Sequence, residues 1–256
     1  MRHVQFKNVG KIYRSRRGPI VALDNINLDI DAGSFVSIVG ASGCGKSTLL
    51  KCVAGLERIT SGEITVGEIP VSEPPRDMGF VFQRDLLFDW RTIVDNVLVS
   101  AEFEGKARRD FTDRAHKLLA IFGLSGYAAR YPWELSGGMR QRVAICRSLL
   151  CSPKFLLMDE PFGALDALTR DELNDELQAR WIGEAMTVLF ITHSISEAVF
   201  LSDRVAVMDR SPGRIAAVFE IDLPRPRSQS SRETVAFTKY AAAIRQTMNE
   251  FGAVSR

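Results

Sequence analysis

One nine-residue stretch constrains the fold of this chain more than any other feature. Residues 40–48 read Gly-Ala-Ser-Gly-Cys-Gly-Lys-Ser-Thr, which matches the phosphate-loop pattern G-x-x-x-x-G-K-[ST]. The apolar run 35–39 precedes this stretch and the helix-like run 49–54 follows it, so the local order is strand, glycine-rich turn and helix. In that order the N–H groups of the turn and the N-terminus of the helix converge on one anion. The sequence therefore predicts an α/β fold with a P-loop NTPase core.

The bulk composition is that of a soluble globular protein, with 46% hydrophobic and 25% charged residues. A length of 256 residues allows one large domain or two small ones. The 33 basic and 31 acidic residues are mixed along the chain, so we expect no nucleic-acid partner. No apolar run is long enough to span a bilayer and the N-terminus lacks the apolar stretch of a secretion signal. We therefore expect the chain to stay in the cytosol.

The four cysteines are expected to be reduced, buried and small hydrophobic residues. They are Cys44, Cys52, Cys146 and Cys151, and none forms a C-x-x-C pair. Without that spacing, neither a disulfide framework nor a metal site is indicated.

The first 90 residues have the pattern of short strands around the phosphate loop. Alternation at 4–6, 20–23 and 26–30 predicts three strands, with a basic turn at 13–19 between the first two. After the loop, Gly55 is expected to end the helix, 61–67 to form an exposed edge strand and 78–82 a buried strand. Gln83 ends the buried strand, where it is either a ligand in the crevice of the sheet or a solvated loop residue.

Residues 92–150 lose the strand pattern and are predicted to form a helical insertion between two strands. The aromatic loop 86–90 before it is either a partner surface or a segment that folds back onto the insertion. Within the insertion, Ser136 is a good helix N-cap, and Gly137 and Gly138 would let backbone N–H groups approach an anion. The same Ser-Gly-Gly triplet is also compatible with a flexible turn. We take it as a candidate second helix-start anion site.

Two carboxylates follow a buried strand at 155–158. Such a strand delivers Asp159 and Glu160 to the crevice end of the sheet. In a nucleotide site the first carboxylate can hold Mg²⁺ through water, with Ser47 as a direct ligand and Lys46 neutralising the terminal phosphates. The second carboxylate is then free to polarise an attacking water.

The remaining pattern adds one more candidate site residue. A helix is expected after the turn 164–166, and a buried strand at 187–192 ends at His193, which either contacts a γ-phosphate or is structural. A strand pair around the turn 211–213, a rigid linker at 223–227 and an amphipathic terminal helix that packs on the body complete the chain.

The chain resembles the ATPase subunit of an ABC transporter. The resemblance rests on features that occur in this order: the phosphate loop, Gln83, the Leu-Ser-Gly-Gly-Met-Arg-Gln segment at 135–141, Asp159-Glu160, the 164–166 turn and His193. The longer strings 157–170, 197–204 and 223–227 resemble the nitrate, sulfonate and taurine importer group. The resemblance implies an ABC ATPase domain over 1–224, followed by a linker and C-terminal helix over 225–256. Its core with an N-terminal antiparallel β subdomain covers 1–91 and 151–224, and an α-helical subdomain covers about 92–150.

The resemblance also implies roles that the residues alone leave open. Tyr13, which by itself could be a base platform or a packing aromatic, would stack the adenine. Glu160 would be the general base and His193 would hold the γ-phosphate. Gln83 would contact Mg²⁺ and the attacking water, and Asp166 would lie at a dimer seam. The expected ATP ligands are Tyr13, Gly40, Ser42, Gly43, Cys44, Gly45, Lys46, Ser47, Thr48, Ser136, Gly137 and Gly138, and the expected Mg²⁺ ligands are Ser47, Gln83 and Asp159.

The implied assembly is a homodimer in which Ser136 of one chain closes over the phosphate loop of the other. Its partners would be transmembrane permease subunits and an external solute-binding protein, so the chain would lie at the cytoplasmic face of the plasma membrane. The expected function is ATP hydrolysis that drives uptake of a small anionic solute. A soluble ABC ATPase acting on nucleic acid, ribosomes or cluster assembly is the alternative. Two departures from the family pattern are Asp89, where proline is frequent, and Ser194, where aspartate is usual.

Overall fold

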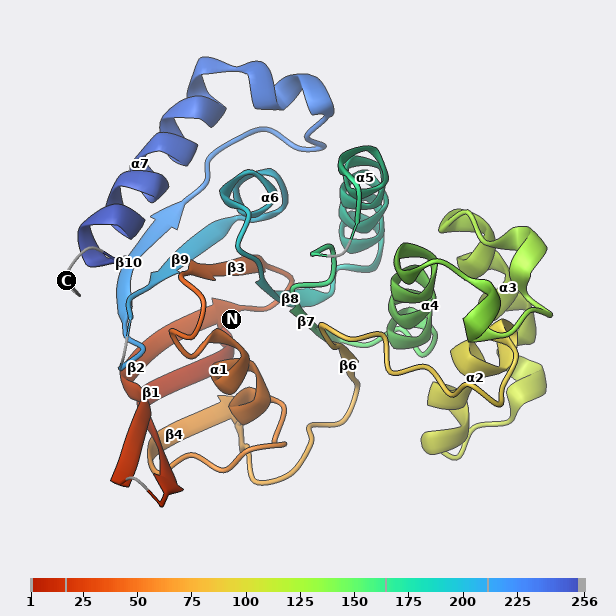
Figure 1. The fold of residues 1–256 in the computed structure, drawn as a ribbon, viewed down its shortest axis with the longest axis horizontal. Helices are drawn as coiled ribbons and strands as arrows, with labels where there is room; N and C mark the ends of the chain where they lie inside the picture. The colour runs from red at the N-terminus through yellow and green to blue at the C-terminus, as the bar shows by residue number, and fades with distance from the viewer. Residues whose placement is uncertain (1, 17, 164, 211, 253–256) are drawn as a thin grey trace.

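Two β-sheets enclose the helix that follows the phosphate loop (Figure 1). The computed structural model describes residues 2–16, 18–163, 165–210 and 212–252. In these residues one sheet has the strand order β2-β1-β4-β5 and the other has the order β10-β9-β3-β8-β7-β6. The strands are β1 (Arg2–Ser15), β2 (Gly18–Asp31), β3 (Phe35–Gly40), β4 (Ser61–Val66), β5 (Ile69–Pro70), β6 (Met78–Val81), β7 (Phe155–Asp159), β8 (Thr187–Ile191), β9 (Arg204–Met208) and β10 (Ile215–Glu220). The α-helices are α1 (Lys46–Val53), α2 (Ile93–Phe103), α3 (Thr112–Ile121), α4 (Gly137–Leu149), α5 (Ala167–Glu184), α6 (Ile195–Leu201) and α7 (Val235–Gly252).

The N-terminal region forms one long antiparallel hairpin, so the expectation of three short strands was wrong. β1 and β2 have 14 residues each. Asn8 and Asn25 adopt φ values of 51° at irregularities of the pairing, which break the alternating pattern while the ladder continues. Asparagine tolerates this left-handed conformation better than most residues. Tyr13 therefore lies inside β1, and Arg17 of the expected basic turn lies outside the described residues.

The connection after α1 agrees with the sequence in one respect and differs in another. Gly55, with a φ of 69°, follows the C-cap Ala54 and ends α1 as expected. The expected edge strand is β4, but β4 pairs with β1 on one side and with the two-residue β5 on the other. The edge position of β4 was therefore wrong.

The six-stranded sheet brings four candidate site segments to one edge. Strands β9, β3, β8, β7 and β6 run parallel, so their carboxyl ends lie together. The phosphate loop follows β3, Asp159 and Glu160 lie at the end of β7, His193 follows β8, and Gln83 follows β6. Segments up to 150 residues apart in the sequence thus meet because of parallel strand pairing.

The segment between β6 and β7 is helical throughout its regular structure, as expected. Its aromatic loop folds back onto the insertion, which is one of the two interpretations of the sequence. The buried Asn96 of α2 accepts a hydrogen bond from Phe88 N at 2.7 Å and donates to Phe88 O at 3.0 Å, which folds the loop onto the helices. Trp90 nevertheless stays 74% exposed.

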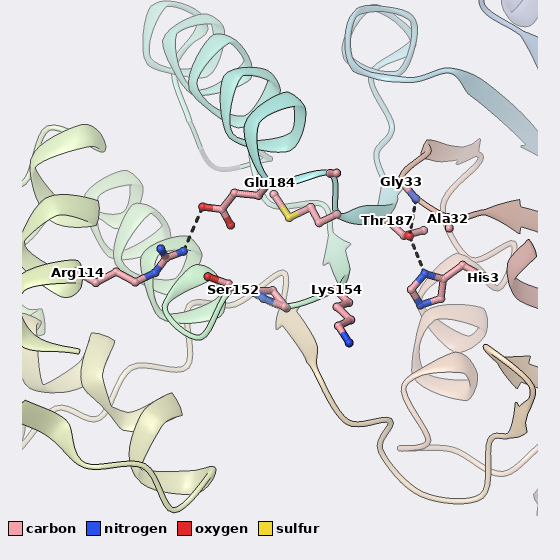
Figure 2. Close-up of a pocket in the computed structure, with 11 residues that line it drawn as sticks. His3, Ala32, Gly33, Arg114, Ser152, Lys154, Glu184 and Thr187 are labelled. Atoms are coloured by element: carbon pink, nitrogen blue, oxygen red, sulfur yellow. Dashed lines mark hydrogen bonds and ion pairs between the residues drawn. The ribbon is translucent and has the colours of Figure 1, made fainter. Parts of the chain in front are cut away.

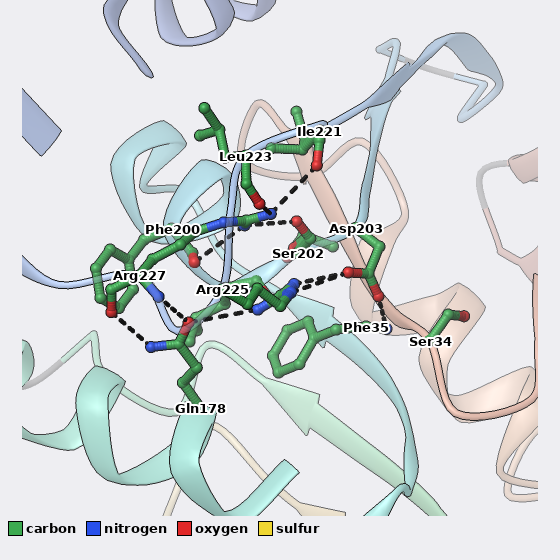
Figure 3. A network of polar contacts seen from close by, with 12 residues as sticks. Ser34, Phe35, Gln178, Phe200, Ser202, Asp203, Ile221, Leu223, Arg225 and Arg227 are labelled. Atoms are coloured by element: carbon green, nitrogen blue, oxygen red, sulfur yellow. Dashed lines mark hydrogen bonds and ion pairs between the residues drawn. The ribbon is translucent and has the colours of Figure 1, made fainter. Parts of the chain in front are cut away.

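Both parts of the C-terminal segment, α7 and the linker before it, pack against the core. In α7, Phe237 and Ile244 are buried against the core, while Tyr240 and Met248 pack beside them, which confirms the expected apolar face. The linker before α7 inserts Arg227 among backbone carbonyls at the end of α6 (Figure 3). Ser211, in the turn between β9 and β10, lies outside the described residues, as does Ala164 of the turn before α5. Among the helices of the described part of the chain, none has the length and apolar character needed to cross a membrane.

Candidate functional site

The phosphate loop requires glycine at its tightest points. Gly45 is the N-cap of α1, with a φ of 102°, and a Cβ there would lie 2.7 Å from Ala22 O. A Cβ on Gly40 would lie 2.5 Å from Met208 O, and the Cys44 side chain packs beneath the same turn. The first turn of α1 carries no acidic residue that would compete with an anion. The local sequence therefore shapes a cradle for phosphate at the helix N-terminus.

Lys46 supplies the positive charge of this cradle. Its side chain is buried, and its ammonium donates to Gly40 O at 2.8 Å and to Ala41 O at 2.9 Å. These carbonyls satisfy a buried cation that would otherwise be costly. The Lys46 ammonium therefore lies inside the loop that would surround the phosphates of a nucleotide.

The loop opens into a cleft of about 390 Å³. Its lining residues come from the phosphate loop, from β2, and from the ends of β6 and β7: Ile20, Val21, Ala22, Ser42, Gly43, Gly45, Lys46, Ser47, Thr48, Gln83 and Glu160. The β2 contribution was missed by sequence reasoning, because nothing in an alternating strand indicates which sheet edge it will reach. Ile20 and Val21 add apolar side chains to the lining of the cleft, which also includes the cationic Lys46.

Ser47 and Asp159 form an oxygen-rich pair beside the cleft. The Ser47 hydroxyl donates to Asp159 Oδ1 at 3.0 Å, so the two side chains that are expected to share Mg²⁺ lie side by side. Burial raises the pKa of the Asp159 carboxyl, the nearby Glu160 charge raises it further, and the Ser47 hydrogen bond opposes both effects. A hydroxyl and a carboxylate are ligands that suit Mg²⁺, so the residues present fit this ion.

The three expected catalytic residues lie together, because the side chains of Gln83 and His193 both approach the Glu160 carboxylate. Gln83 Nε2 donates to Glu160 Oε2 at 3.3 Å, and His193 Nδ1 lies 3.5 Å from the same oxygen. The backbone of Glu160 has a φ of 46°, an uncommon conformation for a residue with a side chain. Its N–H is held by Ile191 O at 2.9 Å. Backbone strain of this kind is frequent at functional positions.

Tyr13 lies near the cleft but does not line it. It pairs with Ile20 across the hairpin, and Ile20 is part of the cleft wall. The Lys11 ammonium lies 4.7 Å from the centroid of the Tyr13 ring. Adenine stacking by Tyr13 therefore remains a prediction.

The Ser-Gly-Gly segment lies outside the cleft. Ser136 is the N-cap of α4, as expected, and its hydroxyl accepts from Met139 N at 3.3 Å. Ser136 and Gly137 are exposed, and neither they nor Gly138 are among the residues that line the cleft. A Cβ on Gly138 would meet Leu165 Cδ2 at 2.7 Å, which places this helix start against the turn before α5. Within one chain, the second helix-start site is thus separate from the first.

A larger cavity, about 490 Å³, lies at the opposite edge of the sheet (Figure 2). Lys154 and Thr187 border it at the amino ends of β7 and β8. Its polar groups are partly paired, with Arg114 Nη2 3.1 Å from Glu184 Oε1 and His3 Nδ1 2.8 Å from Thr187 Oγ1. Its size alone does not make it the functional site, because the phosphate loop and the paired carboxylates are at the other edge.

The comparison with known families agrees with this geometry. A family profile described as ABC transporter matches residues 23–163. The chain belongs to the ABC transporter family. A taurine import ATP-binding protein of Rhizobium johnstonii is 48% identical over 214 residues, covering 83% of this chain and 82% of the relative. A nitrate import ATP-binding protein of Synechocystis sp. is 43% identical over 248 residues, covering 94% of this chain and 93% of the relative.

A solved ABC structure has the same fold. The dimeric post-hydrolysis structure of the ATP-binding cassette MJ0796, bound to ADP and Pi, superimposes with a TM-score of 0.78 at 32% identity. The match covers 86% of this chain and 100% of that one. The P-loop ABC ATPase fold expected from the sequence is therefore confirmed.

One departure from the usual ABC transporter pattern has a structural explanation. Ser194 is the N-cap of α6, and its hydroxyl accepts from Glu197 N at 3.3 Å. Serine and aspartate are both good N-caps, so the exchange preserves this function. Asp89 is exposed beside Trp90, and nothing in the structure explains its presence in place of proline.

Proposed function

We propose that this chain is the ATP-hydrolysing subunit of an importer for a small, anionic solute. The observation that carries the proposal is the convergence of Lys46, Glu160 and Gln83 on one cleft, at the edge where the parallel strands end. This arrangement provides a phosphate cradle and a carboxylate that can act on water. Relatives that are named taurine and nitrate import ATP-binding proteins support the import direction and the solute class.

In the proposed reaction, the loop and Lys46 bind the β- and γ-phosphates of ATP. Glu160 accepts a proton from the attacking water, and Gln83 orients that water. His193, which shares the Glu160 carboxylate, contacts the γ-phosphate. Mg²⁺ would be held by Ser47, Asp159 and Gln83, and when bound it neutralises phosphate charge.

The proposed active unit is a dimer. Ser136 and Gly137 are exposed at a helix start and outside the cleft of their own chain, so they are free to cover the γ-phosphate in a second chain. The MJ0796 cassettes, which have the same fold, are dimeric, and this supports a dimer. Loss of the γ-phosphate would then remove the group that joins the two chains and allow them to separate.

The proposed partners are transmembrane permease subunits and a solute-binding protein outside the membrane. The chain would therefore lie as a peripheral subunit at the cytoplasmic face of the plasma membrane. The exposed Trp90 beside Gln83's loop is a candidate contact for a permease, since large apolar side chains at the surface are typical of interfaces. The solute itself is recognised by the partner proteins. ATPase activity of the reconstituted transporter, measured across sulfonates, nitrate and taurine, would identify it.

The first test is Glu160→Gln. We expect this variant to bind ATP and to form a stable ATP-dependent dimer, while kcat falls by about 10²–10⁴-fold because the base is lost. Glu63→Gln is the matched control, because Glu63 is exposed on β4 and lies outside the cleft. Gel filtration with and without ATP and a phosphate-release assay are the measurements. Wild-type turnover in Glu160→Gln would refute the role of Glu160, and an inactive wild-type chain would refute the ATPase proposal.

A further inference from the structure

The loop that carries Gln83 is held by hydrogen bonds from side chains of α4. Gln141 Nε2 donates to Phe82 O at 3.0 Å, immediately before Gln83. Arg147, farther along the helix, donates to Asp85 O and Leu86 O at 2.8 Å each. Because these donors belong to the helix that begins at the Ser-Gly-Gly segment, the Gln83 loop is attached to that helix and not only to β6.

Arg140 makes the most informative of these contacts. Its Nε donates to Asp85 Oδ2 at 2.9 Å, and its Nη1 donates to Leu135 O at 2.9 Å. Leu135 directly precedes Ser136, and Asp85 is two residues after Gln83. One planar guanidinium therefore holds both segments, with a charge-assisted bond on one side and a backbone carbonyl on the other.

A continuous path of contacts runs through Arg140. At one end Gln83 Nε2 donates to the Glu160 carboxylate at 3.3 Å. At the other end the Leu135 carbonyl fixes the chain just before the N-cap of α4. Close packing supports the path, because a Cβ on Gly79 of β6 would lie 2.7 Å from Ser148 O of α4. The strand, the loop and the helix leave little space for independent movement.

We propose that Arg140 is a positioning residue that joins the Gln83 loop, which serves the chain's own ATP site, to the Ser136 segment, which serves the site on the partner chain. The inference rests on the dimer described under the proposed function. It adds that the two ATP sites are coupled within each chain. ATP that orders Gln83 in one site thereby orders the Ser136 segment that covers the other. A lysine could not replace Arg140, since a single ammonium lacks the fork that reaches both partners.

The first arm of the test measures amide hydrogen exchange in the full chain without nucleotide. In Arg140→Gln we expect exchange of both 84–88 and 136–139 to rise at least about fivefold, because each segment loses a tether. Arg130→Gln is the control, since Arg130 pairs with Glu134 in the same helical region and, within the described part of the chain, its side chain forms no hydrogen bond or ion pair with the Gln83 loop. Unchanged exchange in either segment of Arg140→Gln would overturn the bridge. This arm does not depend on ATPase activity.

The second arm measures ATPase rate against ATP concentration. We expect a wild-type Hill coefficient above about 1.5 that falls to about 1 in Arg140→Gln, with an apparent KM about tenfold higher. Asp85→Asn, a milder change, should have the same effect, and the double variant should be no worse than Arg140→Gln. Additive effects, or a Hill coefficient that both single variants retain, would overturn the coupling. An inactive wild-type chain with the expected exchange result would instead refute the proposed function and leave the bridge intact.

Discussion

Arg227 provides the sharpest stability prediction of this structure. Its side chain is 2% exposed and belongs to the linker that precedes α7. Its Nη1 donates to Val199 O at 2.7 Å, Phe200 O at 3.1 Å and Ser202 O at 2.7 Å, which are carbonyls at the C-terminal end of α6. Its Nη2 donates to Ile221 O at 3.2 Å and Leu223 O at 3.3 Å (Figure 3). A cation at a helix C-terminus is also favoured by the helix dipole.

The substitution Arg227→Met keeps the aliphatic stem and removes every one of these donors. Arg227→Met leaves these backbone carbonyls without their donor, and an unsatisfied buried acceptor typically costs about 1–3 kcal/mol. Part of this cost is offset, because burial itself opposes the charge and lowers the pKa of Arg227 to about 10. That pKa is still well above neutral pH, so the guanidinium is charged under ordinary conditions. We therefore expect a net loss of about 3 kcal/mol, the cost of one to three unsatisfied carbonyls. For a chain of this size that loss corresponds to a fall in Tm of about 6–12 °C.

Thermal unfolding followed by circular dichroism is the assay. Arg245→Met is the control, because Arg245 is exposed on α7 and surface substitutions usually change stability by less than about 0.5 kcal/mol. Arg227→Lys keeps the charge and should fall between the two, since one ammonium reaches fewer carbonyls. A Tm of Arg227→Met within about 2 °C of the control would refute the reasoning. It would mean that water replaces the guanidinium at the end of α6 at no cost.

Three further predictions concern the ATP site. Folding raises the pKa of Asp159, so its charged form lowers native stability at pH 7, and this penalty disappears as the pH falls through the raised pKa toward the ordinary value. Asp159→Asn should therefore raise the Tm of the nucleotide-free chain at pH 7, and should raise it by less at acidic pH. The same variant should no longer be stabilised by Mg-ATP. A Tm of the nucleotide-free variant below that of the wild type at pH 7, measured by calorimetry, would contradict the first expectation. Tyr13→Ala should raise the KM for ATP about tenfold through lost stacking, and Tyr13→Phe should not, so equal KM values for all three proteins would argue against adenine stacking. Ser136→Ala should leave ATP binding to the monomer unchanged, as measured with a fluorescent nucleotide, and should weaken ATP-dependent dimerisation; impaired binding by the monomer would show that Ser136 acts within its own chain.

The sequence was most informative where the chemistry is local. The phosphate loop, the N-cap Ser136 and the strand before Asp159 depend on residues within a few positions of one another, and each was recognised from spacing alone. Parallel pairing then explains why Gln83, Glu160 and His193 meet, because carboxyl ends of parallel strands share an edge.

The sequence was least informative where backbone irregularity or long-range pairing decides the outcome. The irregularities at Asn8 and Asn25 interrupt the alternating sequence pattern, although the hairpin is continuous, since a bulge shifts the alternation without ending the strand. The contact of Arg140 with Asp85 spans 55 residues, and no local pattern distinguishes this arginine from its neighbours. The same is true of Arg227, which was predicted only as part of a rigid linker and is buried.

In each half of the proposed ATP site, the charged side chains already have partners within the chain. The Lys46 ammonium is satisfied by loop carbonyls, and Glu160 is held by Gln83 and His193, so neither group needs a ligand for folding. Ser136 is exposed and does not line this cleft, and in the proposed dimer it would contribute to the cleft of the second chain. Catalysis would therefore be controlled by the approach of two preformed halves, and any partner that changes the separation or tilt of α4 would change the rate. Arg140 gives that control a defined route, because a tilt of α4 that moves Ser136 must also move the loop of Gln83.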